Sequence, residues 1–196
     1  FVLGDPLSVL KLSGMNTING PLTLNAGTLD VDESSALSGD LTLGGSVTVD
    51  VVQGKTLTYS GAALEVGAYI LTLQGGGILD SVNALKLNQT GGLVELYGIS
   101  EVNAPVELTG GGLKAAESSV LSGVLSLSGP STVEVAPQKK LSYQGGGLEL
   151  GINSLEIKGD GELEFTAPQA ALVLNGPGSL LLLSGSGRIP RVSIQA

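Results

Sequence analysis

The feature that most constrains this sequence is that it matches itself when shifted by 84 positions. The matching runs include Glu33-Ser34-Ser35 with Glu117-Ser118-Ser119, Leu37-Ser38-Gly39 with Leu121-Ser122-Gly123, and Tyr59 with Tyr143. Near the C-terminus the shift grows to 87, which indicates a three-residue insertion around residues 167–171. Self-similarity at a fixed period is the signature of repeat architectures. We therefore expect one continuous domain over residues 1–196, built from tandem copies that cover approximately 1–21 (partial), 22–105 and 106–194.

A shorter rhythm runs inside each copy. Apolar residues flank one polar residue in triplets such as Leu22-Thr23-Leu24, Leu71-Thr72-Leu73 and Leu155-Glu156-Ile157. Such alternation predicts β-strands with one buried face, and the Gly, Ser and Asn residues between triplets predict tight turns. The one helix candidate, around residues 32–36, is equally good as a loop.

The spacing of the triplets predicts how the strands are arranged. Leu57, Leu64, Leu71 and Leu79 follow one another at seven or eight residues, so each strand and its corner are short. Strands of an ordinary sandwich average about 5–6 residues, which is longer than these triplets. We therefore predict an all-β fold, a parallel β-solenoid that is right-handed and three-sided, with about 21 residues per turn and about nine turns. Each strand then pairs with the strands one turn above and one turn below it.

The composition excludes several kinds of chemistry. The chain has no Cys and no His, so disulfides and sites that use a thiolate or an imidazole cannot form. A net charge of −9 and 3% aromatic residues argue against nucleic-acid binding, which needs basic surfaces and stacking rings. No apolar run approaches the ~18 residues of a membrane helix. We predict no cofactor, no metal site, no nucleic-acid partner and no membrane span.

Catalysis is not expected either. Asp30, Asp32 and Glu33 lie close in sequence and could in principle form a paired-carboxylate site, but the second copy keeps only Glu117 of the three acids. Pectate-lyase-like enzymes resemble this chain in fold only, because their sites need clustered aspartates with a basic residue. The chain is therefore predicted not to be an enzyme.

Two surface patterns leave alternatives open. If a turn holds about 21–23 residues, Asp50, Thr72 and Glu95 stack on one side, and Glu134 and Glu156 stack later. Like charges ~5 Å apart repel modestly in water, and a weakly bound divalent cation or a basic partner would relieve this. Outward threonines such as Thr72 are compatible with an ice-binding surface, although the second copy replaces that residue with Glu156.

Some larger and polar residues also recur at equivalent places. Tyr59 and Tyr143 either fill a wider part of the core or form a platform on which a glycan stacks, and they are the only candidate site residues. Four asparagines suit left-handed corners or asparagine ladders. They are Asn19, Asn88, Asn103 and Asn175.

Phrases of the type Leu-Thr-Leu-x-Gly recur in the chain, as in Leu41-Thr42-Leu43-Gly44-Gly45 and Leu71-Thr72-Leu73-Gln74-Gly75-Gly76. These phrases resemble the β-helical passenger and stalk regions of bacterial surface adhesins. Autotransporter passengers and filamentous-haemagglutinin-like proteins are examples. The resemblance is one of composition and period, covers the whole chain and carries over no functional residue. It implies secretion, display at the cell surface and a scaffold or adhesive role.

The function we expect is a structural rod or stalk segment of an extracellular adhesin or surface fibre. The pattern is cut off before Leu10 and after Ile194, so the expected partners are neighbouring repeats of a longer chain or another copy stacked end to end into a filament. A surface glycan is a further partner under the alternative function, a carbohydrate-binding or carbohydrate-processing β-helix. An ice-binding solenoid is the third alternative.

Overall fold

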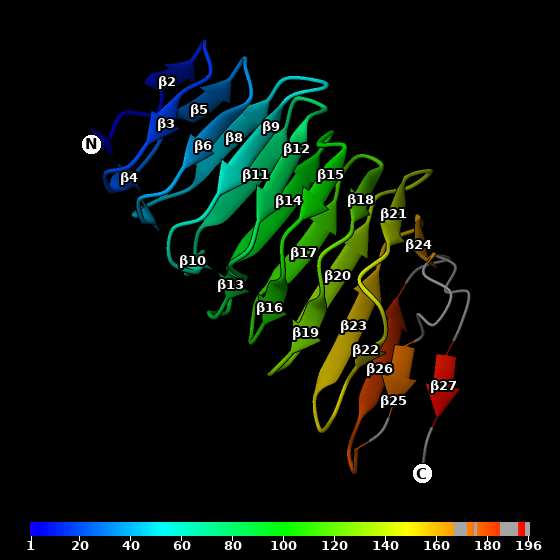
Figure 1. Cartoon of the computed structure of the whole chain (residues 1–196). Coiled ribbons are helices and arrows are strands. Elements are labelled where there is room, and N and C mark those ends of the chain that lie inside the picture. The colour runs from blue at the N-terminus through cyan, green and yellow to red at the C-terminus, as the bar shows by residue number, and fades with distance from the viewer. Residues whose placement is uncertain (167–171, 175, 185–191, 195–196) are drawn as a thin grey trace.

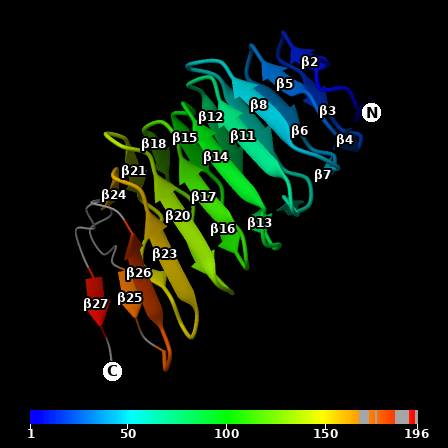
Figure 2. The ribbon, with the colours of Figure 1, turned by 180° about the vertical axis from the view of Figure 1, so that it is seen from behind.

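The computed structural model describes residues 1–166, 172–174, 176–184 and 192–194. Within these residues the chain forms strands and turns only, wound into a parallel β-solenoid of about 8 turns of about 22 residues. Figure 1 shows the turns stacked along one axis, with the two termini at opposite ends, and Figure 2 shows the same stack from behind. The predicted all-β parallel solenoid is confirmed, while its right hand and its three sides stay predictions.

Strands whose numbers differ by three stack on one another. The nine-stranded sheet has the order β2 (Val9–Leu12), β5 (Thr28–Val31), β8 (Val47–Val51), β11 (Ile70–Gln74), β14 (Leu93–Tyr97), β17 (Gly112–Ala115), β20 (Ser131–Val135), β23 (Ser154–Lys158) and β26 (Leu180–Ser184). The eight-stranded sheet contains β3 (Thr17–Ile18), β6 (Ser35–Leu37), β9 (Thr56–Tyr59), β12 (Ile78–Ser81), β15 (Glu101–Asn103), β18 (Ser119–Leu121), β21 (Lys140–Tyr143) and β24 (Glu162–Phe165).

The remaining strands form a third row that is broken into three sheets, which we call the interrupted row. Its first sheet contains β1 (Val2–Leu3), β4 (Leu22–Leu24) and β7 (Leu41–Leu43). The second contains β10 (Leu64–Glu65), β13 (Leu85–Leu87), β16 (Val106–Leu108) and β19 (Leu125–Leu127), and the third contains β22 (Leu148–Glu149), β25 (Leu172–Leu174) and β27 (Val192–Ile194).

The core is one column of aliphatic side chains inside the turns. Alternate residues of a strand point to opposite faces, so the outer residues of each triplet are buried and the middle residue is partly exposed. In the strand Val47–Val51 the three valines are buried and the two polar residues are not. The buried residues form a single cluster that runs from Leu3 to Leu172. Burial of a leucine or valine contributes about 1.5–3 kcal/mol relative to exposure, so this column is the main driving force for stacking.

The turns are unequal in length, and three successive lengths repeat from the first copy to the second. Along the nine-stranded sheet, Leu10, Leu29, Val49 and Leu73 form one column in which each residue pairs with the next. The number of residues that separate the two members of a pair along the chain increases from each pair to the next. The second copy has the same column one repeat later, in Val94, Leu113, Val133 and Ile157. The repeat unit is therefore a series of different turns rather than the four equal turns that the sequence spacing suggests.

Residues 32–36, the weak helix candidate, turn out to contribute to a strand. Ser35 and Ala36 belong to β6, and Ser35 is buried at an inward position. Its hydroxyl donates to the carbonyl oxygens of Gly14 and Glu33 at 3.1 and 2.9 Å. These bonds satisfy the buried hydroxyl, so serine can stand where the alternation pattern requires an apolar residue.

One position carries backbone strain that the first copy avoids. Gln138 has φ 63°, the only positive φ of a non-glycine residue in the described part of the chain, and its counterpart Gly54 has φ 76°. A side chain in this region costs about 1–2 kcal/mol, partly offset by the greater unfolded-state entropy of glycine. We expect Gln138→Gly to raise the free energy of unfolding, measured in urea, by about 0.5–1 kcal/mol. The matched variant Gly54→Gln should lower it, and a destabilised Gln138→Gly protein would contradict this account.

Candidate functional site

Tyr59 and Tyr143, the candidate glycan-stacking residues, lie in the core. Tyr59 ends β9 and is 3% exposed, and Tyr143 ends β21 and is 1% exposed. Tyr143 also packs edge-on against Phe165, with ring centroids 5.4 Å apart. Neither ring presents a face to solvent, which favours the core-filling interpretation of these residues over the glycan platform.

Each tyrosine hydroxyl accepts a hydrogen bond from a backbone amide in the interrupted row. The amide of Leu41 donates to the Tyr59 hydroxyl at 3.1 Å, and the amide of Leu125 donates to the Tyr143 hydroxyl at 3.0 Å. The Tyr59 hydroxyl in turn donates to the carbonyl oxygen of Ala62 at 2.6 Å. At these two places the tyrosine hydroxyl is therefore the hydrogen-bond acceptor, a role that backbone carbonyl oxygens have elsewhere in the row.

The comparison with the unbroken parts of the row makes this substitution clear. There, the first amide of a strand donates to a backbone carbonyl of the following turn. These bonds are Leu22 to Asp40 and Leu64 to Ala84 at 2.9 Å, and Leu85 to Pro105 and Val106 to Val124 at 2.8 Å. Leu41 begins β7 and Leu125 begins β19, and the row is broken directly after these two strands. The hydroxyl thus takes the amide hydrogen bond at both breaks.

A glycine two residues after each tyrosine leaves room for the ring. A Cβ atom added at Gly61 would lie 2.8 Å from the Tyr59 hydroxyl and ring edge, and one at Gly145 would lie 2.8 Å from the Tyr143 ring. We call these places the tyrosine gaps. The first consists of Leu41, Tyr59 and Gly61, and the second of Leu125, Tyr143 and Gly145.

Burial raises the pKa of both tyrosine hydroxyls above the ordinary value of 10.0. For Tyr59 the hydrogen bond from Leu41 lowers the pKa, and the charge of Asp40 raises it further. In the folded chain the hydroxyls therefore stay protonated at pH values at which an unfolded tyrosine ionises.

This difference makes the fold sensitive to alkali. The stabilisation from the protonated hydroxyls is fully present below about pH 10 and is lost as pH rises from there through the folded-state pKa. Lys11, Lys114 and Lys140, whose pKa values are raised by ion-pairing hydrogen bonds, act in the same direction. We expect urea unfolding between pH 8 and 11 to show the stability of the wild type falling towards that of a Tyr59→Phe/Tyr143→Phe variant. A constant difference between the two proteins across this range would contradict the prediction.

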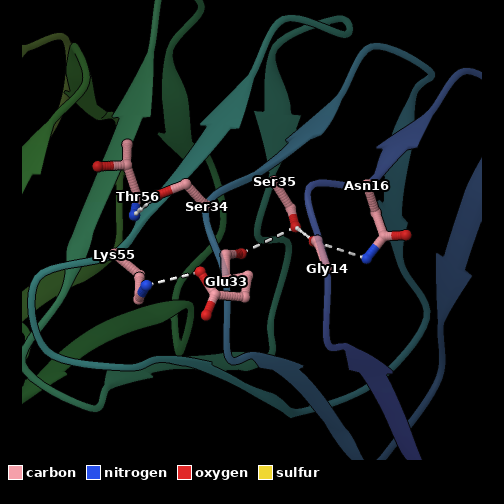
Figure 3. Close-up of polar contacts among 7 residues, drawn as sticks. All are labelled: Gly14, Asn16, Glu33, Ser34, Ser35, Lys55 and Thr56. Carbon is pink, nitrogen blue, oxygen red and sulfur yellow. Dashed lines mark hydrogen bonds and ion pairs between the residues drawn. The ribbon is translucent and has the colours of Figure 1, made fainter.

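The repeated Glu-Ser-Ser tripeptide forms a clasp between two turns (Figure 3). Lys55 Nζ lies 2.5 Å from the Glu33 carboxylate of the preceding turn. Ser34 Oγ accepts a hydrogen bond from the amide of Thr56 at 3.1 Å, and Ser35 Oγ reaches back to the turn before. One tripeptide therefore contacts the turns on both sides of it.

The second copy builds the contacts of the clasp with the following turn, while Ser119 bonds to the carbonyl oxygen of Glu117 within the tripeptide. Lys139 pairs with Glu117, and Ser118 Oγ accepts from the amide of Lys140 at 3.1 Å. Exposed ion pairs of this kind contribute only about 0–1 kcal/mol. The clasp therefore contributes little stability, and its main effect is to favour the correct pairing of neighbouring turns.

The three neighbouring acids of the first copy each face a lysine. Lys11 Nζ lies 3.2 Å from Asp30 and 2.7 Å from Asp32, and Glu33 pairs with Lys55. Among the residues the structure describes, no group of three or more His, Cys, Asp or Glu is placed to hold a metal ion.

Outward charges alternate in sign along the later strands of the nine-stranded sheet, whereas Asp30 and Asp50 pair directly in the earlier ones. One column of directly paired residues consists of Thr72, Glu95, Lys114, Glu134 and Lys158. Lys114 Nζ lies 3.0 Å from Glu95 Oε1. Asp50 pairs with Gln74, whose amide donates to it at 2.7 Å, and Glu156 pairs with Thr132. The predicted neighbouring places of Thr72 and Glu95 are confirmed. The prediction is wrong for Asp50 on Thr72 and for Glu134 on Glu156, because the turns differ in length and shift the columns relative to an even spacing.

The recurrent asparagines bond to side chains of neighbouring turns. Asn88 donates to a glutamate and Asn103 to an aspartate, both at 2.7 Å, and Asn19 accepts from a serine at 2.6 Å. None of these three has a positive φ, so for them the predicted left-handed corners are wrong, as are asparagine ladders. Asn175 and the predicted insertion at 167–171 lie outside the described residues.

Surface hollows also occur in repeat-related pairs. On the nine-stranded sheet, one hollow of about 430 Å³ in the second copy matches one of about 360 Å³ in the first. Equivalent lining residues are Gly112 and Thr28, Thr132 and Thr48, and Glu156 and Thr72. The lining positions and the series of turn lengths recur after the same distance in sequence, so the hollows belong to the repeat unit.

Sequence reasoning found the tyrosines but missed their polar role. The available signal was the Tyr-x-Gly phrase at an inward position, since a glycine two residues on lies on the same face of the strand. Nothing in the sequence marks which backbone amide the hydroxyl meets, because Leu41 precedes Tyr59 by nearly a full turn.

The repeated turns, gaps and clasps place this chain in the class of tandem-repeat parallel β-solenoid proteins. Comparison with models of protein families, with curated proteins and with solved structures finds no match. The part of the chain that the structure describes offers no helix of the length and apolarity that a membrane span requires.

Proposed function

We propose that this chain is a structural rod or stalk segment of an extracellular adhesin or surface fibre. The observation that carries the proposal is the nine-stranded sheet, in which every strand from β2 to β26 pairs with the next without a break. Nine strands at ~4.8 Å spacing give a hydrogen-bonded spine of about 38 Å. A continuous spine along the axis suits a stiff spacer.

The other contacts support the same role. The aliphatic column runs through the turns, and ion pairs such as Lys114 with Glu95 and Lys55 with Glu33 join adjacent turns. These interactions act along the axis and hold one turn on the next. The resemblance of the Leu-Thr-Leu-x-Gly phrases to adhesin stalks supports the extracellular and surface part of the proposal.

Rod length tests the mechanical part. A variant with residues 22–105 duplicated should lengthen the particle by about 19 Å in small-angle X-ray scattering, at constant cross-section, because four strands at ~4.8 Å are added to the spine. A variant that gains mass without gaining length contradicts the rod. Antibody labelling of intact source cells tests the location, and labelling that requires permeabilised cells contradicts surface display.

The partners we propose are neighbouring repeats of a longer chain or a second copy stacked end to end, since parallel ladders can be extended by further turns. Negative-stain microscopy of the purified chain at rising concentration tests the second possibility. Fibres one solenoid wide are expected, and a monodisperse monomer at all concentrations contradicts end-to-end stacking.

The paired hollows favour binding of a surface glycan as a second candidate function. Equivalent hollows lie four turns apart, about 19 Å along the axis, so a polysaccharide lying along the rod would meet the same shape twice. The threonine hydroxyls of Thr48 and Thr132 can hydrogen-bond sugar hydroxyls. Selective binding on a glycan array that is lost in Thr48→Val/Thr132→Val would support this function, and no binding by the wild type would contradict it.

A further inference from the structure

The two tyrosine gaps differ from every other turn-to-turn junction in the middle of the chain. At an ordinary junction all three rows are bridged by paired strands, and β13 and β16, for example, pair over three residues. At the junctions β7 to β10 and β19 to β22 the interrupted row has no strand pairing, and only the other two rows continue. In its place each gap has an amide bonded to a tyrosine hydroxyl.

The first gap also borders a small void. An apolar cavity of about 10 Å³ adjoins Tyr59 and is lined by Leu41 and Leu64, which come from the two sides of the gap. Side chains that line a void lose dispersion contacts on that side. The void thus lies at the place where the backbone ladder is broken.

The corner next to each gap is made of two stacked glycines. A Cβ at Gly61 would lie 2.4 Å from the carbonyl oxygen of Gly39, and a Cβ at Gly145 would meet that of Gly123 at 2.1 Å. Glycine has the greatest backbone freedom of any residue. Stacked glycines also occur at other corners, such as Gly92 on Gly67, so the broken ladder is the feature that sets both gaps apart, and the first gap also has the void.

We infer that the tyrosine gaps are the interfaces at which this solenoid opens first, so that the four turns between them open and close as one cooperative unit. A solenoid is close to one-dimensional, and its stability is a sum of turns and nearest-neighbour interfaces. In such a chain the weakest interfaces set the boundaries of the units that open together. The four strands β10, β13, β16 and β19 form the unbroken row of that unit.

Native-state hydrogen exchange of the full chain at low urea tests this inference. We expect the amides of Leu85 and Val106, inside the unit, to exchange together and at least tenfold more slowly than those of Leu41 and Leu125 at the gaps. Equal protection at all four amides would overturn the inference. So would protection that falls smoothly from the middle of the chain to its ends with no step at the gaps.

A single variant provides an internal control. Tyr59→Phe should speed exchange of the Leu41 amide at least tenfold and leave Leu125, at the other gap, unchanged. Acceleration of the Leu41 and Leu125 amides by the same factor would show that both exchange only through global unfolding, and would overturn the assignment of the gap as a local opening point. If this variant does not fold, the wild-type comparison of the four amides decides alone.

Discussion

Replacing Tyr59 and Tyr143 together with phenylalanine is expected to lower the free energy of unfolding by about 2–6 kcal/mol, because each change leaves a buried amide without its acceptor at a cost of about 1–3 kcal/mol. The amides concerned are those of Leu41 and Leu125, which bond to the hydroxyls at 3.1 and 3.0 Å. The two sites are four turns apart, so their effects should add. Equilibrium unfolding in urea measures both the single and the double variants.

Tyr97 supplies the matched control. It is 54% exposed at the end of β14, so Tyr97→Phe removes the same hydroxyl with no buried amide involved and should change stability by less than about 0.5 kcal/mol. If the buried and the exposed variants lose equal stability, the hydroxyls do not act as acceptors for the interrupted row.

A deletion of one whole repeat should fold, whereas a deletion of a single average turn should not. Removing residues 22–105 joins Pro21 to Val106 and reproduces the natural junction of Pro105 with Val106. The turn lengths repeat at this distance, so the turns that follow keep their order and pairing. We expect a folded solenoid with a cooperative thermal transition and a β-sheet circular dichroism spectrum.

The shorter deletion shows whether turn length matters. Removing residues 22–42 joins Pro21 to Leu43, which places two glycines where strand β4 has Thr23 and Leu24. The alternation is lost there, and each one-residue slip moves side chains to the opposite face. Exposed apolar surface and aggregation are expected. A one-turn deletion as stable as the whole-repeat deletion would show that the series of turn lengths has no role.

Much of the fold could be predicted because the residues of a triplet such as Leu71-Thr72-Leu73 are enough to indicate a strand, without knowledge of its partners. Apolar residues at alternate positions specify the strand and its buried face together, and this triplet is indeed the centre of β11. The order of the turns follows from the repeat. The register between paired strands does not, because it depends on the length of each turn. The corners of the short turn from Leu10 to Leu29 and of the long turn from Leu155 to Leu181 look alike in composition and so do not reveal that length.

The candidate site was harder to predict for the same reason. Whether Glu95 faces Lys114 depends on adding the lengths of several corners, and an error of two residues would place Gly112 or Ala116 opposite it instead. The contact of Tyr59 with Leu41 depends on the spacing between two turns, which no local pattern reports. Long-range partners therefore had to come from the structure.

The unequal turns carry a consequence for how such a chain finds its native pairing. In a solenoid of identical turns, a segment can dock one turn too high or too low at almost no energetic penalty, and many misaligned states compete with the native one. Here the number of residues per turn differs at each of the four successive turns that lead from Leu10 through Leu29, Val49 and Leu73 to Leu96. A shift by one turn misaligns the corners that follow, and only a shift by a whole repeat restores agreement. The unequal turn lengths thus raise the energy of misaligned states, which in a solenoid of identical turns would lie close to the native state and slow its folding.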